Sequence, residues 1–339
     1  ILGTRIKVSP DYAAFSNGYA IRYLDWNDTY LSLEPAHPSD NISGILAIGE
    51  TERSSGKEIL LSIVLAYEIQ CRLCDIASLR SKGWDHVNYL LISSVLAISK
   101  LMNLSLEKME ESVKIVLNNL STRQNRIGEL SNWKAAAASN AVRNAVFSAK
   151  LSKAGLTGPS EIFEGKYGFQ NQVSGEFNLD IEKFGMKGRD FLLPETYLKK
   201  HNAEYHAQSS IEAALELRTQ LRDIDEIESL IIETHEAGFT IIGDKEKDPD
   251  KWDPKTRETA DHSLPYTTVT SLIDGEITEK QYEMNKIRDI NSLDLIKRVK
   301  VIENPEFTKS YPKEGIINKV TISLKNGDRL SSQIDFPKG

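Results

Sequence analysis

The stretch Val320-Thr321-Ile322-Ser323-Leu324-Lys325-Asn326-Gly327-Asp328-Arg329-Leu330 decides what kind of fold the second half of the chain has. Apolar and polar residues alternate as far as Leu324, and alternation resumes after the turn, with Leu330, Ile334 and Phe336 on one face. Asn326-Gly327 is a pair typical of a tight turn between two strands. The pattern therefore predicts a β-hairpin close to the C-terminal end.

The sequence before this hairpin mixes helical and strand signals. Residues 227–242 are rich in Ile, Thr and Phe, which favours strands, whereas helical periodicity recurs over residues 209–222, 264–273 and 278–289. Helices that accompany a short antiparallel hairpin indicate an α+β domain.

The first half of the chain shows only helical periodicity. Apolar residues recur at intervals of three and four, and the predicted helices cover residues 58–79, 86–102, 106–120 and 133–154. Ser105 is a suitable N-cap for the third of these helices, and Gly155 is a suitable stop after the fourth. This half is therefore predicted to be an all-helical domain.

A change of composition separates the two halves. Residues 155–188 are rich in Gly, Pro, Phe and Asn and include Thr157-Gly158-Pro159, which is typical of a connection. We therefore predict an all-helical domain over residues 1–187 and a smaller α+β domain over residues 188–339.

Composition excludes several classes of partner. The chain has 339 residues, enough for two domains, and a formal net charge of -7 without a block of Lys or Arg, which argues against nucleic acid and anionic membranes as partners. Its two cysteines, Cys71 and Cys74, can build neither a disulfide framework nor a four-thiolate metal site, so a reducing compartment fits best. The longest apolar stretches are too short to span a bilayer, and no signal peptide is recognisable.

The richest cluster of chemical groups lies in residues 23–41. If the first helix continued through Thr29, then Asp25 and Thr29 would project from one face, with Asp28 beside them. Pro38 cannot continue a helix, so His37 lies on an extended or turning backbone that can fold back over that face. An acidic helix end followed by a solvated loop explains the same residues without a function.

Seven segments in order along the chain resemble the MmgE/PrpD family, and within it the dehydratases that act on 2-methylcitrate. They are Asn17-Gly18 with Arg22-Tyr23-Leu24-Asp25-Trp26-Asn27-Asp28-Thr29 and His37-Pro38-Ser39-Asp40-Asn41, then Gly83-Trp84-Asp85-His86, Gly128-Glu129-Leu130-Ser131-Asn132-Trp133-Lys134, Thr157-Gly158-Pro159, Ala203-Glu204-Tyr205-His206-Ala207-Gln208-Ser209, Thr234-His235-Glu236 and Ala260-Asp261-His262-Ser263-Leu264-Pro265-Tyr266.

The resemblance implies an all-helical domain followed by a smaller α+β lid, with the active site in the cleft between them and a homodimer as the usual assembly. Proteins of this family normally begin before the position of Ile1 and return to the helical domain after the hairpin. We therefore expect this sequence to lack helical pieces at both ends.

The activity implied by the resemblance is a cofactor-free removal of water from 2-methylcitrate, with citrate as a second candidate substrate. The product would be 2-methyl-cis-aconitate, an intermediate of propionate catabolism by the methylcitrate cycle, in the cytoplasm or the mitochondrial matrix. Such a reaction needs a base that removes the proton from the carbon next to a substrate carboxylate, and an acid that protonates the departing hydroxyl. It also needs cations or hydrogen-bond donors that stabilise the charge developing on that carboxylate. Two cysteines are too few for the usual ligands of an iron–sulfur cluster, and no metal site is expected.

The resemblance also supplies candidate residues for this chemistry. The expected catalytic residues are Asp25, Thr29, His37, His86, Lys134, Lys199, His206 and Tyr266, and the expected substrate-binding residues are Asp28, Arg126 and His262. Lysines can bind carboxylates as point charges and histidines can carry protons near neutral pH. We expect His37 and His86 to be the proton carriers, Asp25 to orient a histidine, and Tyr266 or a lysine to assist the leaving group.

Simpler interpretations stay open for these residues. His86 can belong to the first turn of its helix, Lys134 can face solvent, and Tyr266 can be part of the core. Lys199 is less secure because His201-Asn202 replaces the family's Phe-Pro, and His235 is expected to be structural. Alternative functions are decarboxylation of cis-aconitate, epimerisation of the iminodisuccinate type, or carboxylate binding without catalysis.

Overall fold

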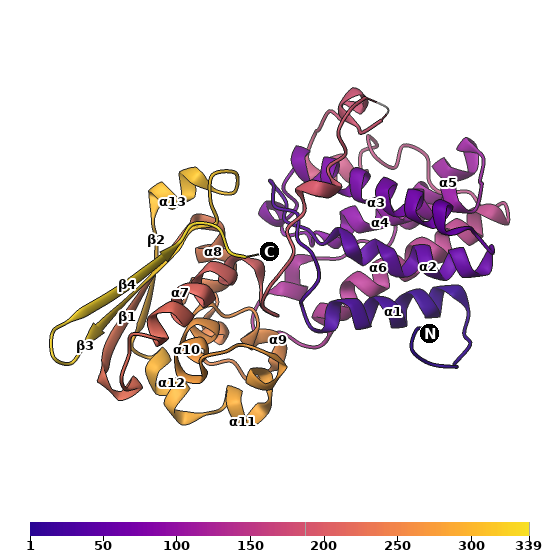
Figure 1. Cartoon of the computed structure of the whole chain (residues 1–339). Helices are drawn as coiled ribbons and strands as arrows, with labels where there is room; N and C mark the ends of the chain where they lie inside the picture. Colours follow the sequence, from indigo (N-terminus) through magenta and orange to yellow (C-terminus); the bar gives the residue numbers. More distant parts are fainter. Residues whose placement is uncertain (187, 339) are drawn as a thin grey trace. The chain divides into compact units, whose positions relative to one another are not determined.

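The computed structural model describes residues 1–186 and 188–338, and its contacts divide the chain into two compact units (Figure 1). The helical unit comprises Ile1–Tyr23, Asn27–Arg126 and Trp133–Tyr197. The α+β unit comprises Leu24–Trp26, Ile127–Asn132 and Leu198–Gly339, so two short segments of the first half belong to it. The predicted boundary falls at residue 187, which lies outside the described residues.

The described part of the helical unit contains six α-helices. The helices are α1 Pro10–Tyr23, α2 Ile42–Thr51, α3 Gly56–Ile76, α4 Val87–Leu101, α5 Leu106–Val116 and α6 Trp133–Lys153. Short 3₁₀ turns lie in the connections α1–α2, α3–α4 and α5–α6. Ser55 begins α3 with a capping box to Glu58, and Ser105 caps α5 as predicted. Gly155 follows α6 with a φ of +98°, a conformation that glycine adopts without a steric penalty. The four predicted helices are confirmed.

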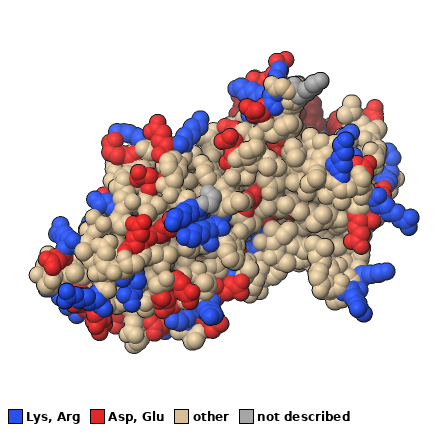
Figure 2. Space-filling model, viewed as in Figure 1, with Lys and Arg blue, Asp and Glu red and all other residues tan. Residues whose placement is uncertain are grey.

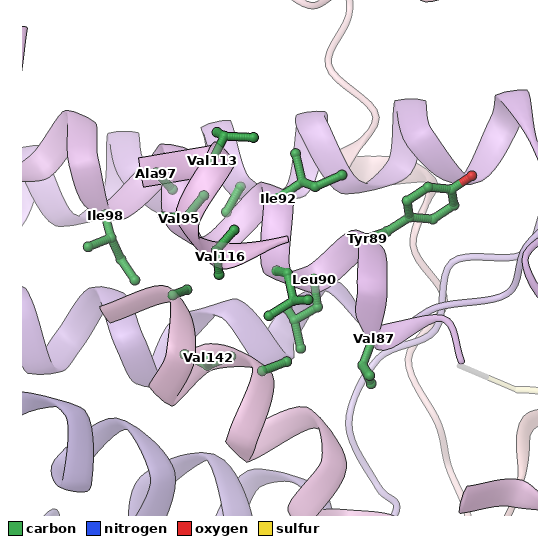
Figure 3. Packing of buried hydrophobic residues seen from close by; sticks show 14 of the residues in the cluster. Val87, Tyr89, Leu90, Ile92, Val95, Ala97, Ile98, Val113, Val116 and Val142 are labelled. Atoms are coloured by element: carbon green, nitrogen blue, oxygen red, sulfur yellow. The ribbon is translucent and has the colours of Figure 1, made fainter. Parts of the chain in front are cut away.

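Helix α4 forms the centre of this unit. Val87, Leu90, Leu91, Val95 and Ile98 are fully buried, and Figure 3 shows α4 side chains packed among those of neighbouring helices. The polar residues Asn88, Ser93 and Ser94 of α4 are fully buried as well, so other parts of the unit cover this helix on most sides. The beginning of α4 is therefore held rigidly, which matters because His86 is its N-cap residue.

The alanine-rich helix α6 allows close approach of its neighbours. A Cβ atom built on Gly44 of α2 would lie 2.5 Å from Cγ1 of Val142 in α6, and one built on Gly18 of α1 would lie 3.3 Å from the Cα atom of Ser139. The glycines of α1 and α2 therefore let these two helices pack closely on α6.

The α+β unit contains a four-stranded mixed sheet in the order β2-β1-β3-β4. Its strands are β1 Ile227–Thr234, β2 Val299–Glu303, β3 Asn318–Leu324 and β4 Arg329–Ile334. Strand β1 pairs in parallel with β2 and antiparallel with β3, and β3 pairs antiparallel with β4. The predicted hairpin is confirmed, with Gly327 at a φ of +92° in its turn.

Helices bury the apolar side of this sheet. Helix α7 (Gln208–Arg218) contacts β3 and β4, α10 (Leu264–Asp274) packs on α7, and α12 (Ile290–Ile296) packs on α10. Shorter helices are α8 Glu236–Gly238, α9 Arg257–Ala260, α11 Met284–Ile287 and α13 Pro305–Ser310. The expected fold class, a helical domain with a smaller α+β domain, is confirmed.

Several local predictions are wrong. The strand predicted over residues 227–242 ends at Thr234, because Nδ1 of His235 accepts a hydrogen bond from the Gly238 amide and caps a helical turn. The helix predicted over residues 278–289 breaks at Glu283 into a 3₁₀ turn and α11. Short apolar runs do not distinguish strand from helix by periodicity alone.

The first helix does not continue to Thr29. Helix α1 ends at Tyr23, and Asp25 has a φ of +49°, which is not a helical conformation. Thr29 forms an isolated bridge with Tyr197 instead. The side chains of Asp25 and Thr29 therefore do not share one helix face.

The surface carries mixed charge. On the face shown in Figure 2, Lys and Arg side chains are interspersed with Asp and Glu side chains. Among the described residues, no helix combines the length and hydropathy that crossing a bilayer requires.

Replacing Gly44 by Ala tests the close contact between α2 and α6. The added methyl group overlaps Val142, so we expect the free energy of unfolding to fall by about 1–3 kcal/mol. Gly56→Ala is the matched control, because a Cβ at Gly56 meets no atom within 4 Å. Urea unfolding measures both variants, and equal stabilities would contradict the packing argument.

Candidate active site

A network of polar side chains shapes the loop between α1 and α2. Arg22, which is buried, donates from Nη1 to Oδ1 of Asn27 at 2.7 Å. The amide of Asn27 in turn donates to Oγ of Ser39 and Oδ1 of Asp40. Asp28 accepts a hydrogen bond from the backbone amide of Ser39 at 3.0 Å. Asp28 was predicted to bind substrate. In the structure its carboxylate holds the backbone of this loop at Ser39.

This loop fixes the orientation of His37. Nδ1 of His37 lies 2.7 Å from the carbonyl oxygen of Asp28 and 3.3 Å from Oγ1 of Thr29. Because a carbonyl oxygen only accepts, Nδ1 must carry a proton, and this tautomer is assigned from the hydrogen bond. In the neutral ring the lone pair is then on Nε2, which is the nitrogen able to act as a base.

His86 is oriented by the acid that precedes it. Nδ1 of His86 lies 3.0 Å from Oδ1 of Asp85, and Nε of Arg126 lies 3.1 Å from Oδ2 of Asp85. The amide of Val87 also donates to Asp85. Burial alone would raise the pKa of Asp85, but Arg126 and His86 hold that pKa well below its ordinary value.

Burial keeps His86 in its neutral form. Loss of hydration lowers the pKa of His86, an effect that Asp85 opposes and Arg126 reinforces. Nε2 of His86 is buried and has no hydrogen-bond partner among the described residues. A neutral imidazole whose Nδ1–H is held by a carboxylate presents a basic Nε2.

The two histidines lie beside each other. The ring centroids of His37 and His86 are 5.4 Å apart and the ring planes meet at 73°. In each ring an oxygen holds the Nδ1 proton, so the lone pair of the neutral imidazole is on Nε2. Of the predicted residues, the structure brings together Thr29, His37, His86 and Arg126.

Arg126 also connects this cluster to Lys134. Its Nη1 donates to the backbone carbonyl of Lys134 at 3.1 Å, and Lys134 is buried in the first turn of α6. Arg126 was predicted to bind a carboxylate of the substrate, and that role stays a prediction. In the structure it contacts a carboxylate of the protein, that of Asp85. Through Asp85, Arg126 is also linked to His86.

A second cluster lies in the α+β unit and includes Asp25. Nζ of Lys199 lies 2.8 Å from Oδ1 of Asp25 and donates to the Asp25 carbonyl at the same distance. Nδ1 of His262 lies 3.3 Å from Oδ2 of Asp25 and 2.7 Å from Oδ1 of Asp261. Trp26 donates from Nε1 to the Lys199 carbonyl and fixes the backbone of that lysine. The structure shows contacts of Asp25 with Lys199 and His262, and its expected place beside Thr29 and His37 stays a prediction.

The side chains of this cluster include possible metal ligands, but their negative charge is already partly neutralised. Asp25, Asp261 and His262 present ligand atoms within 4.8 Å of one another. The ammonium of Lys199, 2.8 Å from Asp25, would repel a divalent cation at the same oxygen. The donor set therefore fits an internal ion pair better than a resident metal.

The third group centres on His206. Oε1 of Glu204 lies 2.7 Å from Nδ1 of His206, and Nε2 of His206 lies 2.9 Å from the hydroxyl of Tyr311. Burial would raise the pKa of Glu204, but His206, His262 and Lys199 lower it to about 2. Glu204 is therefore ionised at neutral pH.

Tyr266 lies apart from these contacts. It is fully buried in α10, and its hydroxyl donates to the backbone carbonyl of Gln281. Burial raises its pKa above the ordinary value. The predicted role of Tyr266 stays a prediction. The neighbouring Tyr282 has a buried hydroxyl without a hydrogen-bond partner among the described residues, and Asp261 and Asp25 add to the burial that raises its pKa.

Four residues of these clusters were not singled out from the sequence for a site role. They are Asp85, Glu204, Asp261 and Tyr311. The three acids have a visible signal, because each stands one or two residues before a histidine. Tyr311 has no such signal, since it reaches His206 across 105 positions of the chain.

The titration of His86 tests the geometry of the first cluster. We expect its imidazole to titrate below pH 6.5, because burial disfavours the charged ring. In Asp85→Asn the titration moves to still lower pH, because Asp85 raises this pKa. NMR of the histidine rings measures both, with Asp75→Asn as the control for loss of an acid elsewhere in the helical unit. A shift of the Asp85→Asn titration to higher pH would contradict the arrangement.

The buried pair of Lys199 and Asp25 is tested by removing one charge and then both. Lys199→Met leaves the Asp25 carboxylate buried without its ammonium, so we expect unfolding to become easier by about 3–5 kcal/mol. The double variant Asp25→Asn/Lys199→Met should recover most of that loss. Lys153→Met, which breaks the partly exposed pair with Glu52, should cost at most about 1 kcal/mol. Denaturant unfolding decides, and a double variant no better than Lys199→Met would refute the pairing.

Comparison with known proteins gives a consistent result. Residues 1–182 match the MmgE/PrpD N-terminal domain and residues 201–339 match the MmgE/PrpD C-terminal domain. A 2-methylcitrate dehydratase of Escherichia coli K12 is 30% identical over 363 residues, covering 99% of this chain and 72% of the relative. A mitochondrial 2-methylcitrate dehydratase of Yarrowia lipolytica is 30% identical, covering 99% and 68%, and a probable 2-methylcitrate dehydratase of Saccharomyces cerevisiae is 31% identical, covering 100% and 69%. The chain belongs to the MmgE/PrpD family.

Proposed function

We propose that the chain is a hydro-lyase that removes water from 2-methylcitrate to give 2-methyl-cis-aconitate. The names of its relatives support a dehydratase of this kind. The observation that carries the proposal is the His37–His86 pair, whose ring centroids are 5.4 Å apart and whose Nδ1 atoms each lie beside an oxygen acceptor.

The reaction sets demands that ordinary side chains can meet. A base takes the proton from the carbon next to a carboxylate, and that electron pair forms the new double bond. The bond between the neighbouring carbon and its hydroxyl oxygen then breaks. The oxygen leaves with the bonding electron pair and takes up a proton to form water. Donors and cations must stabilise the charge that develops on the carboxylate.

His86 is our candidate for the base. Its lowered pKa keeps Nε2 unprotonated at neutral pH, and the ionised Asp85 opposite Nδ1 stabilises the imidazolium that forms when the proton arrives. Arg126 is a positioning residue, because it keeps Asp85 ionised. His37 is the second candidate proton carrier.

Lys134 is our candidate for binding a substrate carboxylate. It is a buried cation at the start of α6, beside the Arg126 contact. Lys199 and His262 both contact the Asp25 carboxylate, so its negative charge already balances part of the positive charge that they could offer to a substrate. The proposal assigns Lys199 the task of holding Asp25 and the backbone around Trp26 in place.

The reaction is proposed to proceed on side chains alone. Cys71 and Cys74 are both buried in α3, and burial raises the pKa of each thiol. Neither cysteine is therefore suited to act as a thiolate ligand or nucleophile.

An assay with three acids tests the proposed function. The purified chain is incubated with 2-methylcitrate, citrate and cis-aconitate, with and without a chelator, while ultraviolet absorbance of an unsaturated acid and released carbon dioxide are followed. We expect unsaturated product from 2-methylcitrate, unaffected by the chelator. For His86→Ala and His37→Ala we expect kcat to fall by about 10²–10⁴-fold.

His201→Asn is the control for loss of a histidine elsewhere. His201 is buried in the α+β unit, and its pKa is lowered to about 4 by burial and Lys200. The His201→Asn variant should leave kcat unchanged. Carbon dioxide from cis-aconitate would favour a decarboxylase, and silence with all three acids would favour a binding protein. A folded His86→Ala variant with wild-type turnover would exclude His86 as the base.

A further inference from the structure

The side-chain amide of Asn41 is buried where the loop that contains His37 meets helix α2. Asn41 ends a 3₁₀ turn over Pro38–Asn41 and is the N-cap residue of α2, yet its side chain makes no capping hydrogen bond. The residue is 0% exposed. A buried amide costs free energy unless its polar groups are hydrogen-bonded, so its partners indicate what it does.

The full hydrogen-bonding capacity of this amide is used. Nδ2 donates to the Pro38 carbonyl at 2.9 Å and to Oε1 of Gln70 at 2.6 Å. Oδ1 accepts from the hydroxyls of Ser93 at 2.9 Å and Ser94 at 2.6 Å. Because a backbone carbonyl only accepts, the nitrogen must face Pro38, and the orientation of the amide is assigned from that contact. We call Asn41 with its three side-chain partners the Asn41 hub.

The hub holds the turn that follows His37. The Asp40 amide donates to the His37 carbonyl at 3.0 Å, and Pro38 is the first residue of the turn. Asn41 is the last residue of the turn, so its bond to the Pro38 carbonyl joins the two ends. Since α3 and α4 both anchor this amide, the turn has little freedom to move.

Helix α3 also fixes the oxygen that holds the His37 ring. Nδ1 of His37 lies 2.7 Å from the Asp28 carbonyl oxygen, and the Asp28 carboxylate is hydrogen-bonded to Tyr67 of α3. Tyr67 and Gln70 are three positions apart and therefore lie on one face of α3. This face holds the loop on both sides of the histidine, at Asp28 through Tyr67 and at Asn41 through Gln70.

We propose that Asn41 is a positioning residue of the candidate active site, which holds His37 in the tautomer and direction that the reaction requires. The proposal rests on the proposed dehydratase function and deepens it by naming what keeps this histidine in place. Every residue that the argument uses lies in the helical unit, within Asn27–Arg126.

Loss of the hub would change the histidine in a measurable way. The proton of the neutral ring is on Nδ1 because the Asp28 carbonyl accepts it. When the turn loosens, Nδ1 and this oxygen separate, and the neutral ring divides between its two tautomers. The lone pair on Nε2 is then present in only part of the molecules. A misplacement of about 1 Å can also lower turnover by about 10²-fold.

Asn41→Leu tests the proposal, because leucine is close to asparagine in size and forms none of the four hydrogen bonds. Ser94→Ala is a milder variant, which removes one of the two donors to Oδ1 and decides the matter where Asn41→Leu does not fold. Nitrogen NMR of the histidine rings, at a pH where they are neutral, measures the tautomer of His37.

In the wild-type protein we expect the His37 proton on Nδ1, and in both hub variants a mixture of the two tautomers. With 2-methylcitrate we expect kcat to fall by about 10²-fold in Asn41→Leu and by a smaller factor in Ser94→Ala.

Ser99→Ala is the matched control. Ser99 is also a fully buried serine of α4, and its hydroxyl pairs with that of Ser112. Its loss should lower the free energy of unfolding, measured in urea, to an extent similar to that of Ser94→Ala. The tautomer of His37 and kcat should stay as in the wild type.

A changed tautomer with lower kcat, confined to the hub variants, supports the proposal. An unchanged tautomer in a folded hub variant overturns it, and so does a changed tautomer with wild-type turnover. The same change in Ser99→Ala would indicate general loosening of the helical unit and would also overturn it. A wild-type protein that dehydrates none of the acids contradicts the proposed function, while the tautomer measurement still decides whether Asn41 holds His37.

Discussion

A carboxylate in a protein interior stays ionised only where donors are aimed at it, and the helical unit is arranged around one such group, Asp85. Arg126, Asn125, the Val87 amide and His86 all direct N–H groups at its two oxygens. The amide of Asp85 itself donates to the Ser121 carbonyl. The same contacts fix the start of α4, the segment that contains Arg126, and the tautomer of His86. Protonating or removing Asp85 would therefore loosen all three at once.

The α+β unit also pairs buried acids with histidines that follow them closely in the sequence. Asp261 contacts Nδ1 of His262, and Glu204 contacts Nδ1 of His206, each at 2.7 Å. Placing the acid one or two residues before the histidine lets the two groups be buried together, so that neither loses its hydration without compensation. In all three acid–histidine pairs Nδ1 is engaged, and the task of each ring is therefore decided by the surroundings of Nε2. His235 is the contrast, because its Nδ1 accepts from a backbone amide.

The sequence predicted most of the helical unit because its helices are long and strongly periodic, and the hairpin because alternation and Asn326-Gly327 agree. Strand β2 and helix α13 were not predicted, since both are short and their stability comes from packing on β1 and α8. The position of Asp25 also escaped prediction. Asp25 has a positive φ, and its carboxylate pairs with Lys199, 174 positions along the chain, so the local pattern does not reveal this contact. Candidate histidines could be found from motifs, whereas Tyr311 required the fold.

The two neighbouring histidines are not equivalent, because different oxygens hold their Nδ1 protons. The Nδ1 proton of His37 is held by a neutral carbonyl, and that of His86 by an ionised carboxylate. A carbonyl dipole stabilises a charged imidazole less than a full negative charge does. Loss of hydration lowers the pKa of His86 and favours its neutral form before the reaction, and its carboxylate then favours the charged ring that proton transfer creates. A base must be unprotonated at rest and stabilised once protonated. His86 meets both conditions, and His37 meets the second less well because a neutral carbonyl holds its Nδ1 proton.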